Sequence, residues 1–569
     1  MAKYTADFET NNSILECRVW AYAICEIGNT DNFIYGNSIE GFIDWCKKVK
    51  GNPTIYFHNL KFDGEYILNY LFNKGYKWVK DKKEVEDNTF TTLITDTGLW
   101  YMIEIYFKVG KKTKKVKILD SLKILNFSVD KIAKDFHLPI SKLEIDYNEV
   151  RKVNHVLTEE EIKYIRNDVT IMAMALEIMF KEGLTKMTIG SDALSWYQDK
   201  LGAFKSYFPI LDYDIDKVIR KSYKGGWTYA NPLHIEEEIG EGIVIDKNSM
   251  YPFQLCDKTL PFGEPIHFDG RYIEDKSYPL YVQSITCSFK IKKGKLPTIQ
   301  LKNTLGFIPN EYIETTNGEL VTLTLTSVDL NLFYDHYEVE DITFNGGYKF
   351  KGIKGLFNTY VTTWMNRKNE SKKEGNASMY IISKLLLNSL YGKFGLNPNT
   401  RSKEPYLSDE GVLKMHLLPY EIRDSIYVPV ATFVTSYARE DIIRSAQKIR
   451  DYSLKKYGKD YFLYSDTDSI HALKLEEEEL KNLMEIDDYK LGAYKVESTF
   501  KRAVFIRQKC YIEEDYNGVV HSTIAGLPKK LSYKVNFDNF KRGFKTNGKL
   551  MYKHVKGGVI LVDTEFTIK

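Results

Sequence analysis

The first segment with residues suited to chemistry is DFET, near the start of the chain. Asp7 and Glu9 alternate along an expected strand, so both carboxylates face the same side and Phe8 faces the other. Two neighbouring acids repel each other unless a cation lies between them. The pair therefore fits a metal site, although strand edges also carry such pairs for solubility.

Two more segments in the first third of the chain carry similar groups. Asn59 and Asp63 follow the expected strand TIYFH, and Tyr164 and Asp168 lie at i and i+4 on an expected helix. Each pair alone fits a helix cap or an ordinary helix face. Together with the first segment they supply four carboxylates, an amide and a phenol on three segments.

A second set of acids lies in the second half of the chain. Asp246 ends an expected strand in GIVIDKNSMYPFQ, and Asp466 and Asp468 lie at a hairpin tip in FLYSDTDSIHAL. Each segment alone is also compatible with an ordinary aspartate-rich turn.

The segment KLLLNSLYGKFG lies between these acids. Lys384, Asn388 and Tyr391 fall at i, i+4 and i+7, on one face of an expected helix. A cation, an amide and an aromatic ring on one face suit nucleotide binding, and an amphipathic helix with a few polar residues is the alternative.

Hydrophobic periodicity predicts the elements that position these residues. Strands are expected at 3–27 (two), 54–58, 91–106, 115–120, 426–434 and 461–473. Helices are expected at 41–49, 62–72, 129–136, 158–182 and 358–390, the last with a turn at Gly375 and Asn376. The segment 258–359 is strand-rich, and 398–423 is expected to be irregular.

Composition bounds the class of protein. The 569 residues are 43% hydrophobic, which predicts several globular domains and excludes a mainly disordered chain. The net charge is only +3, but the segment 525–569 has ten Lys/Arg and three Asp/Glu, and 108–117 has six lysines. These basic segments favour a polyanionic partner, although a lysine run also suits a hairpin tip.

The remaining features concern the cellular compartment. The six cysteines form no C-x-x-C pair, which argues against a disulfide framework or a structural zinc site. The N-terminus lacks a signal-peptide pattern, and no apolar run reaches about 18 residues. We therefore expect a cytoplasmic protein that is not secreted and does not span a membrane.

DFET, HNLKFD and YIRND resemble, in order and spacing, the three motifs of DnaQ-like proofreading exonucleases. The resemblance implies that Asp7, Glu9, Asp63 and Asp168 bind two divalent metal ions and that Tyr164 positions the attacking water. It further implies single-strand binding by Asn59 and, in LDSLKIL, by Ser121 and Leu122. Lys142 in SKLEIDY resembles an auxiliary exonuclease lysine, with a surface lysine as the alternative.

The later segments resemble motifs A, B and C of family B DNA polymerases. SYKGG at 222–226 resembles the Y-x-G-G motif between the exonuclease and polymerase domains, and QKCY resembles the K-x-Y motif near the thumb. Long segments after motif A and after motif B are typical of the protein-primed branch. The chain is similar to the phi29-like bacteriophage DNA polymerases over essentially its whole length.

This family implies a multidomain α/β and α+β fold: a DnaQ/RNase H-like exonuclease domain followed by a right hand of palm, fingers and thumb. We expect the exonuclease domain at 1–187, the palm at 188–257 and 428–524, the fingers at 360–395 and the thumb at 525–569. Insertion 1, at 258–359, is expected to contact a terminal protein. Insertion 2, at 396–427, is expected to serve processivity and strand displacement.

The resemblance also implies roles for the polymerase residues. Asp246 and Asp468 would hold two Mg²⁺ ions with Asp466 in support, and two more ions would lie in the exonuclease site, with Mn²⁺ as a substitute. The implied nucleotide-binding residues are Tyr251, Lys372, Lys384, Asn388 and Tyr391. The implied DNA-binding residues, beyond the exonuclease site, are Tyr223, Gly225, Gly226, Arg439, Arg507, Lys509 and Tyr511.

The function expected from the family is protein-primed, DNA-templated DNA synthesis with 3′→5′ proofreading and strand displacement. The partners would be primer-template DNA, deoxynucleotides, single-stranded DNA and a terminal protein, acting on a monomer in the cytoplasm of an infected bacterium. Two alternatives are a nuclease whose second half only grips DNA, and a replication scaffold without chemistry.

Overall fold

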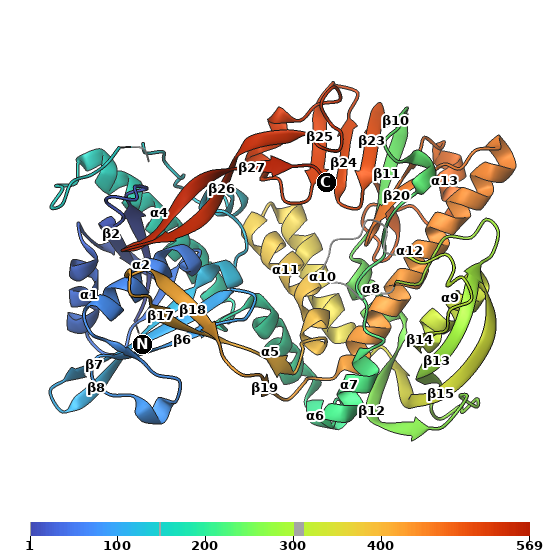
Figure 1. Ribbon diagram of the computed structural model, residues 1–569, viewed down its shortest axis with the longest axis horizontal. Helices are drawn as coiled ribbons and strands as arrows, with labels where there is room; N and C mark the ends of the chain where they lie inside the picture. The colour runs from blue at the N-terminus through green and yellow to red at the C-terminus, as the bar shows by residue number, and fades with distance from the viewer. Residues whose placement is uncertain (1, 147–148, 301–311) are drawn as a thin grey trace.

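A computed structural model describes residues 2–146, 149–300 and 312–569. The chain forms several domains of mixed α and β structure, as expected (Figure 1). No helix in these ranges is long and apolar enough to cross a membrane.

The first domain is built on an eight-stranded sheet in the order β3-β2-β1-β4-β8-β7-β6-β5. Strand β1 pairs antiparallel with β2 and parallel with β4, which places it inside the sheet. The strands are β1 Lys3–Thr10, β2 Val19–Glu26, β3 Asn29–Gly36, β4 Thr54–Phe57, β5 Lys77–Trp78, β6 Thr89–Ile94, β7 Trp100–Val109 and β8 Lys112–Asp120.

Helices α1 Ile39–Lys48, α2 Leu60–Asn73 and α4 Glu159–Lys181 pack on this sheet, and α3 Val129–Asp135 packs on α4. Helix α4 starts at a capping box in which the Thr158 hydroxyl accepts from the Glu161 N–H and the Glu161 carboxylate accepts from the Thr158 N–H. The four helices expected here are confirmed within a few residues.

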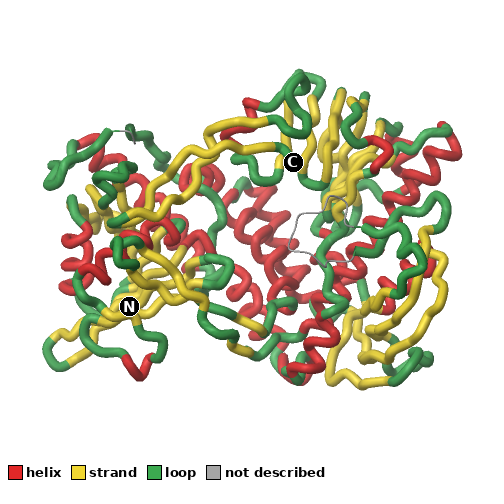
Figure 2. Tube along the Cα trace, viewed as in Figure 1, coloured by secondary structure: helices red, strands yellow, loops and turns green. Residues whose placement is uncertain are grey.

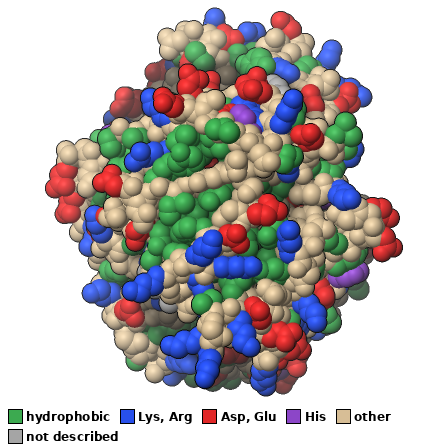
Figure 3. All heavy atoms as spheres, turned by 90° about the vertical axis from the view of Figure 1, so that its left-hand side faces the viewer, with side chains coloured by type: hydrophobic (Ala, Val, Ile, Leu, Met, Phe, Trp, Pro, Cys, Tyr) green, Lys and Arg blue, Asp and Glu red, His purple; other side chains and the backbone are tan. Residues whose placement is uncertain are grey.

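The lysine-rich segment 108–117 forms the β7–β8 hairpin tip, as one of the two alternatives predicted. This hairpin projects at the lower left of Figure 1. Figure 3 shows Lys and Arg side chains gathered toward the same lower end of the domain's outer face.

Helices α5 Ile189–Leu201, α6 Phe204–Tyr207 and α7 Tyr213–Arg220 lead from this domain to a second sheet. The second sheet has the order β22-β11-β21-β20-β9. Its strands are β9 Thr228–Ala230, β11 Gly242–Lys247, β20 Phe462–Asp466, β21 Ser469–Leu473 and β22 Tyr494–Phe500. Helices α8 Met250–Asp257, α12 Val428–Tyr457 and α13 Glu477–Leu483 accompany it.

The strand expected at 426–434 is wrong, because this segment begins the 30-residue helix α12. Its β-branched residues Val428, Val430 and Val434 favour a strand by propensity. All three are fully buried, however, and Pro429 lies in the first turn, where proline is compatible with a helix. Tertiary packing around the whole helix overrides the local preference.

The segment 258–359 forms a four-stranded sheet in the order β12-β15-β13-β14, with one helix, α9 Ser327–His336. The strands are β12 Thr259–Phe268, β13 Leu280–Ile291, β14 Val321–Thr326 and β15 Tyr337–Lys354. The strand-rich prediction is confirmed for the described residues; 301–311 lie outside them.

The helical hairpin expected at 358–390 consists of α10 Asn358–Glu374 and α11 Ala377–Phe394, which pair near the centre of the molecule (Figure 2). Gly375 ends α10 at φ 71°, a left-handed conformation that suits glycine, and the Asn376 side chain caps α11. The predicted turn is confirmed.

The irregular structure expected at 398–423 is wrong. The segment forms two short antiparallel pairs, β16 Asn399–Thr400 with β19 Glu421–Ile422, and β17 Lys403–Leu407 with β18 Leu413–Leu417. Local hydrophobic alternation is weak here, and the hairpin is held by contacts from outside. Thr95 of the first domain bridges to Ser402, and Val412 at the hairpin tip bridges to Lys556.

The C-terminal part contains a separate sheet in the order β10-β23-β24-β25 and a long hairpin. The strands are β10 Glu238–Ile239, β23 Arg502–Arg507, β24 Cys510–Glu514, β25 Val520–Ile524, β26 Lys545–Val555 and β27 Gly558–Thr567. The β26–β27 hairpin spans from this sheet to the first domain (Figure 1). Strands β23 to β25 therefore lie in a different sheet from the strands that carry Asp246, Asp466 and Asp468.

Candidate active sites

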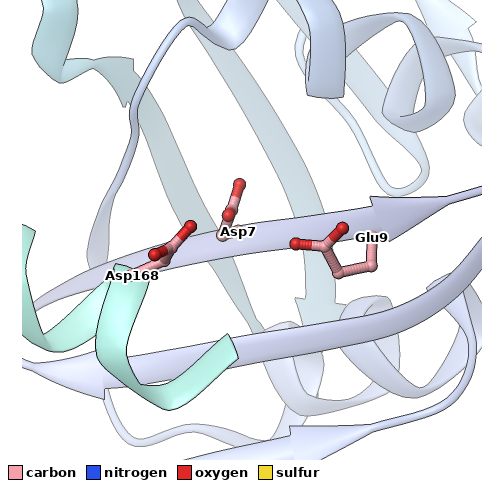
Figure 4. Close-up of side chains that lie close together, drawn as sticks. All are labelled: Asp7, Glu9 and Asp168. Atoms are coloured by element: carbon pink, nitrogen blue, oxygen red, sulfur yellow. The ribbon is translucent and has the colours of Figure 1, made fainter. Parts of the chain in front are cut away.

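The first candidate site lies at the inner strand of the first domain. Asp7 and Glu9 project from β1 and meet Asp168 from α4 (Figure 4). One carboxylate oxygen from each residue lies within 4.8 Å of the other two. Asp63, from the first turn of α2, lines the same cavity of about 630 Å³. The four predicted carboxylates are thus brought together.

Burial and mutual repulsion dominate the electrostatics of this cavity. Burial, and then the Asp168 charge, raise the pKa of Asp7 to about 7. Burial and the neighbouring carboxylates raise the pKa values of Glu9 and Asp63 well above their ordinary range. The ionised carboxylates therefore repel one another, and a bound cation would reduce this repulsion.

The donor set fits a divalent cation. One carboxylate oxygen of Asp63 and one of Asp168 are buried without a hydrogen-bond partner among the described residues. Such orphaned oxygens are costly unless a ligand satisfies them. Clustered carboxylate oxygens are the ligands that Mg²⁺ and Mn²⁺ prefer.

Lys142 and Tyr164 flank Asp168. The Lys142 ammonium forms an ion pair with Asp168 and lies 5.3 Å from the centre of the Tyr164 ring. Burial raises the pKa of Asp168, and the Lys142 charge opposes that rise. Lys142 is thus placed at the site and not in the solvent-facing position of the alternative interpretation.

The second candidate site lies on the second sheet. Asp246 on β11 pairs with Ser469 on β21, and Asp466 at the end of β20 pairs with the same residue. Asp468 lies in the turn between β20 and β21, where its carbonyl accepts from the Lys247 N–H at 2.8 Å. The hairpin therefore brings all three predicted carboxylates to one end of the sheet.

Lysines contact two of these carboxylates. Lys495 lies 3.3 Å from Asp246, and Lys509 lies 2.9 Å from Asp466. Burial, and then the Asp246 charge, raise the pKa of Asp468 to about 7. Asp246 and Asp468 thus repel one another, and a divalent cation between them would relieve this repulsion.

The helical hairpin α10–α11 faces this site. Tyr391 of α11 stacks on Tyr251 of α8, with ring centres 4.1 Å apart and planes 20° apart. Lys372, Lys384 and Asn388 are exposed, the last two on the same face of α11 as Tyr391. The five predicted nucleotide-binding residues therefore lie on the two helices and on α8, where α8 follows the Asp246 strand.

Comparison with known proteins identifies the family. Residues 47–485 match the family described as DNA polymerase type B, organellar and viral. The chain is 43% identical to the DNA polymerase of Bacillus phage Nf and 42% identical to that of Bacillus phage phi29, with 100% of this chain and 99% of each relative covered. The structure of Phi29 DNA polymerase complexed with primer-template DNA matches with a TM-score of 0.92 and 40% identity, over 100% of both chains. The chain belongs to the phi29-like DNA polymerases of type B.

Membership of the phi29-like polymerases confirms the predicted fold class and makes this chain a DNA-directed DNA polymerase. Phi29 DNA polymerase has also been solved with incoming nucleotide substrates and with single-stranded DNA, at TM-scores of 0.92 and 0.91 to this chain. The nuclease-only and scaffold alternatives are not supported.

In this phi29-like polymerase, the predicted Y-x-G-G loop packs against the segments of motifs B and C. A Cβ atom on Gly226 would lie 2.7 Å from the Thr467 side chain, so only glycine fits there. The Tyr223 ring packs on Gly395 at the end of α11, where a Cβ atom would lie 2.5 Å from its hydroxyl oxygen. Gly225 has open space beside it. The loop therefore supports the Asp466–Asp468 turn directly.

Arg439, predicted to bind DNA, is 5% exposed and engaged within the protein. Its guanidinium pairs with Asp329 of α9 at 2.6 Å, donates to the Lys224 and Gly225 carbonyls at 2.8 Å each, and donates to the Ser436 hydroxyl at 3.0 Å. In this arrangement it holds the Y-x-G-G loop in place. Direct DNA contact by Arg439 stays a prediction.

The three predicted DNA-binding residues of the K-x-Y hairpin make different contacts. Lys509 is at φ 54° in the β23–β24 turn and reaches Asp466, and the Tyr511 ring packs 5.1 Å from that of Tyr464. Arg507 is 6% exposed and donates from Nε to the Lys569 carbonyl at 2.9 Å. Of the two cations, Lys509 contacts a polymerase carboxylate, and Arg507 is buried beside Lys569.

The predicted single-strand-binding residues lie at two depths. Asn59 lines the cavity of the first candidate site at φ 73°, with its amide 3.2 Å from the Tyr552 hydroxyl. Ser121 is buried behind it and bonds to His58 at 3.0 Å. Leu122 follows Ser121 in a short 3₁₀ turn and is half-buried.

Sequence analysis missed the wall that the C-terminal part of the chain adds to the cavity of the first candidate site. Side chains from the last 45 residues line it: Lys530, Leu550, Tyr552 and Leu561. The Asn12 side chain bonds to both the N–H and the carbonyl of Leu561, at 2.7 and 3.0 Å. No local pattern could have predicted contacts between residues about 550 positions apart.

Proposed function

We propose that this phi29-like DNA polymerase replicates a linear phage genome from a terminal-protein primer, with 3′→5′ proofreading and strand displacement. The observation that carries the proposal is the presence of two separate carboxylate clusters in one chain of this fold, each with at least one carboxyl pKa raised to about 7. One cluster suits synthesis, and the other suits removal of the primer end.

At the polymerase site, Asp246 and Asp468 would hold two Mg²⁺ ions, with Asp466 in support. When bound, the metal ions would supply charge stabilisation to the attacking and leaving oxygens. The primer 3′ oxygen attacks the α-phosphate of the incoming nucleotide and pyrophosphate leaves. Lys372 and Lys384 would neutralise the β- and γ-phosphates, whose negative charge opposes the approach of the nucleotide.

The aromatic pair would set the shape of this site. The Tyr251 ring, stacked on Tyr391, would lie under the sugar and exclude a 2′-hydroxyl. Tyr391 and Asn388 would contact the new base pair. Tyr223, Gly225, Gly226, Arg439, Arg507, Lys509 and Tyr511 would hold the primer and template backbones, directly or by supporting residues that do.

At the exonuclease site, Asp7, Glu9, Asp63 and Asp168 would hold two Mg²⁺ or Mn²⁺ ions. Tyr164 and Lys142 would orient the attacking water, and Asn59, Ser121 and Leu122 would bind the single strand. The proposal is supported by the enclosed cavity and by the solved complex of Phi29 DNA polymerase with single-stranded DNA.

Ring closure around the duplex would give strand displacement. The β17–β18 hairpin tip meets the β26–β27 hairpin at Val412 and Lys556, and both hairpins contact the first domain. A closed path of protein would keep the enzyme on DNA and let the template enter through a narrow opening. Insertion 1 would receive the terminal protein, and the enzyme would act as a monomer in the cytoplasm of an infected bacterium.

Extension of a primed single-stranded circle with Mg²⁺ and four deoxynucleotides tests this proposal. Product many times longer than the circle is expected without any accessory protein. Product that stops at one circle length would refute intrinsic strand displacement while leaving the polymerase assignment intact.

A matched deletion sharpens the same assay. Replacing residues 402–418 by a short glycine-serine linker should shorten products on the circle more than on a gapped linear template, because only the circle requires displacement. Equal loss on both templates would refute the role of this hairpin.

A further inference from the structure

Helix α10 carries a lysine at the polymerase site that none of the motifs identifies. Lys368 lies one turn before Lys372, on the same side of α10. Its ammonium lies 3.5 Å from the hydroxyl of Ser249, which directly precedes α8. Lys368 thus reaches from the fingers helix to the segment that follows Asp246.

The positive charges of three other lysines act on this ammonium. Burial, and then the charges of Lys384, Lys495 and Lys372, lower the pKa of Lys368. These residues come from α11, β22 and α10, so positive charges from three elements act on the Lys368 ammonium. Lys495 pairs with Asp246, but no carboxylate lies within 4 Å of the Lys368 ammonium among the described residues.

A basic side chain on a helix surface does not usually keep its charge partly buried without an acid beside it. Such a side chain lays its methylenes on the protein and keeps the ammonium in water or beside an acid. Arg367 does this, since it is exposed and pairs with Glu182 at 3.2 Å. Lys368 is half-buried, and its neutral hydroxyl neighbour at 3.5 Å offers little compensation. Unpaired, partly buried positive charge is unfavourable unless an anion joins it.

We propose that Lys368 is a further ligand of the β- and γ-phosphates of the incoming deoxynucleotide, approaching from the Ser249 side of the site. The polyphosphate carries enough negative charge to offset all four lysines, and lysine binds phosphate as a point charge. The inference deepens the proposed nucleotide site of Lys372 and Lys384. The same contact would hold the pyrophosphate that leaves when the new bond forms.

The experiment is single-nucleotide incorporation by Lys368→Met, with Lys373→Met as the matched control. Lys373 lies on the same helix and is exposed. The KM for each of the four deoxynucleotides should rise about 10- to 100-fold in Lys368→Met, the usual range for loss of a charged hydrogen bond. The inhibition constant of pyrophosphate should rise in parallel, Lys368→Arg should retain most affinity, and Lys373→Met should behave as the wild type.

Two results would overturn the inference. An unchanged KM with unchanged pyrophosphate inhibition would show that Lys368 does not touch the polyphosphate. A fall in kcat alone would show that it only supports Ser249. Lys372→Met and Lys384→Met are measured alongside: unchanged KM in all three variants would place the whole nucleotide site elsewhere, whereas failure of Lys368→Met alone would refute only this inference.

A second measurement uses the wild-type protein, so that it tests the inference even if the Lys368→Met variant folds poorly. In the wild-type protein on primed template, a correct deoxynucleotide should protect Lys368 from reductive methylation, while Lys373 continues to react. Equal methylation of Lys368 with and without nucleotide would also overturn the inference.

Discussion

The two carboxylate clusters both bring negatively charged groups together, but they differ in burial and in the lysines that contact them. In the proposed exonuclease site, four acids from β1, α2 and α4 face one cavity, and Lys142 pairs with Asp168. In the polymerase site, β11, the end of β20 and the β20–β21 turn carry the acids, and Lys495 and Lys509 contact two of the three. Most acids of the first cluster are buried in a cavity, whereas those of the second are half-buried at one end of a sheet with lysines beside them.

This difference indicates how far each site depends on a cation. Enclosure raises the pKa values of Asp7, Glu9 and Asp63 together, so these acids favour the protonated form without a metal ion. Lysine contacts at the polymerase site supply part of the compensating charge within the protein. We therefore expect the exonuclease site to respond more strongly to metal removal and to pH.

The largest expected effect is the loss of one activity without loss of the other when one carboxylate cluster is changed. Asp468→Asn should reduce nucleotide incorporation by about 10³-fold or more, because stabilisation of the reacting phosphate is worth several kcal/mol. Asp7→Asn with Glu9→Gln should reduce single-strand degradation to a similar extent. Primer extension and degradation of a labelled single strand measure both activities in each variant.

Each of these variants serves as the control for the other. Degradation should survive Asp468→Asn, and synthesis should survive the double substitution. Loss of both activities in either variant would show that the clusters are not independent.

The second effect concerns stability in a chelator. The folded-state pKa of Asp7 is about 7 and lies above its ordinary value of 3.8, so the folded protein binds more protons between these values. The stabilisation is complete below about pH 4 and is lost as pH rises through about 7, up to about 4 kcal/mol for this group. Thermal melting in chelator should therefore show stability falling across this range.

Added Mg²⁺ should restore more stability at pH 8 than at pH 5, because protons compete with the metal ion. Asp7→Asn should weaken both trends. A Mg²⁺ effect that is equal at both pH values would contradict the predicted dependence of the enclosed site on a cation.

An intermediate effect is expected from the lysine partners. Lys142→Met should lower exonuclease activity about 10- to 100-fold and leave synthesis unchanged, since a charged hydrogen bond is worth about 1.5–3 kcal/mol. Lys509→Met should do the reverse through Asp466. Activity profiles against Mg²⁺ concentration measure both, and equal loss of the two activities in one variant would contradict the separation.

The smallest effect tests the C-terminal wall of the exonuclease cavity. Tyr552→Phe removes the hydroxyl that contacts the Asn59 amide, and should change single-strand KM by less than about tenfold, since a neutral hydrogen bond is worth about 0.5–1.5 kcal/mol. Tyr533→Phe is the matched control, because Tyr533 is 78% exposed. A larger effect on synthesis than on degradation would place Tyr552 at the wrong site.

Local sequence was sufficient to predict the secondary structure of the segments that carry the candidate site residues. The D-x-E spacing on one strand, the i and i+4 pair on α4, and the hairpin with Asp466 and Asp468 all form as predicted. These features depend on periodicity and turn chemistry within about ten residues. The capping box of α4 and the Gly375 turn are local for the same reason.

Other expectations failed or remained incomplete because their causes are distant in sequence. The start of α12 was predicted as a strand, although burial on all sides makes it a helix. The hairpin at 403–417 is held by Thr95 and Lys556 from other domains as well as by its own pairing. The family resemblance implied that Arg439 binds DNA. Its contacts with Asp329 and the 224–225 carbonyls are visible only in the folded protein.

The sequence by itself determined which residues carry acids, amides and lysines, and it placed them on strands, turns and helix faces. It did so because side-chain spacing and backbone preferences act between near neighbours. The tertiary structure decided which of these groups share a cavity, how deeply they are buried and which lysines face them. Burial and charge proximity arise only when distant segments pack, so the raised pKa values, the C-terminal wall and the position of Lys368 could be recognised only in the fold.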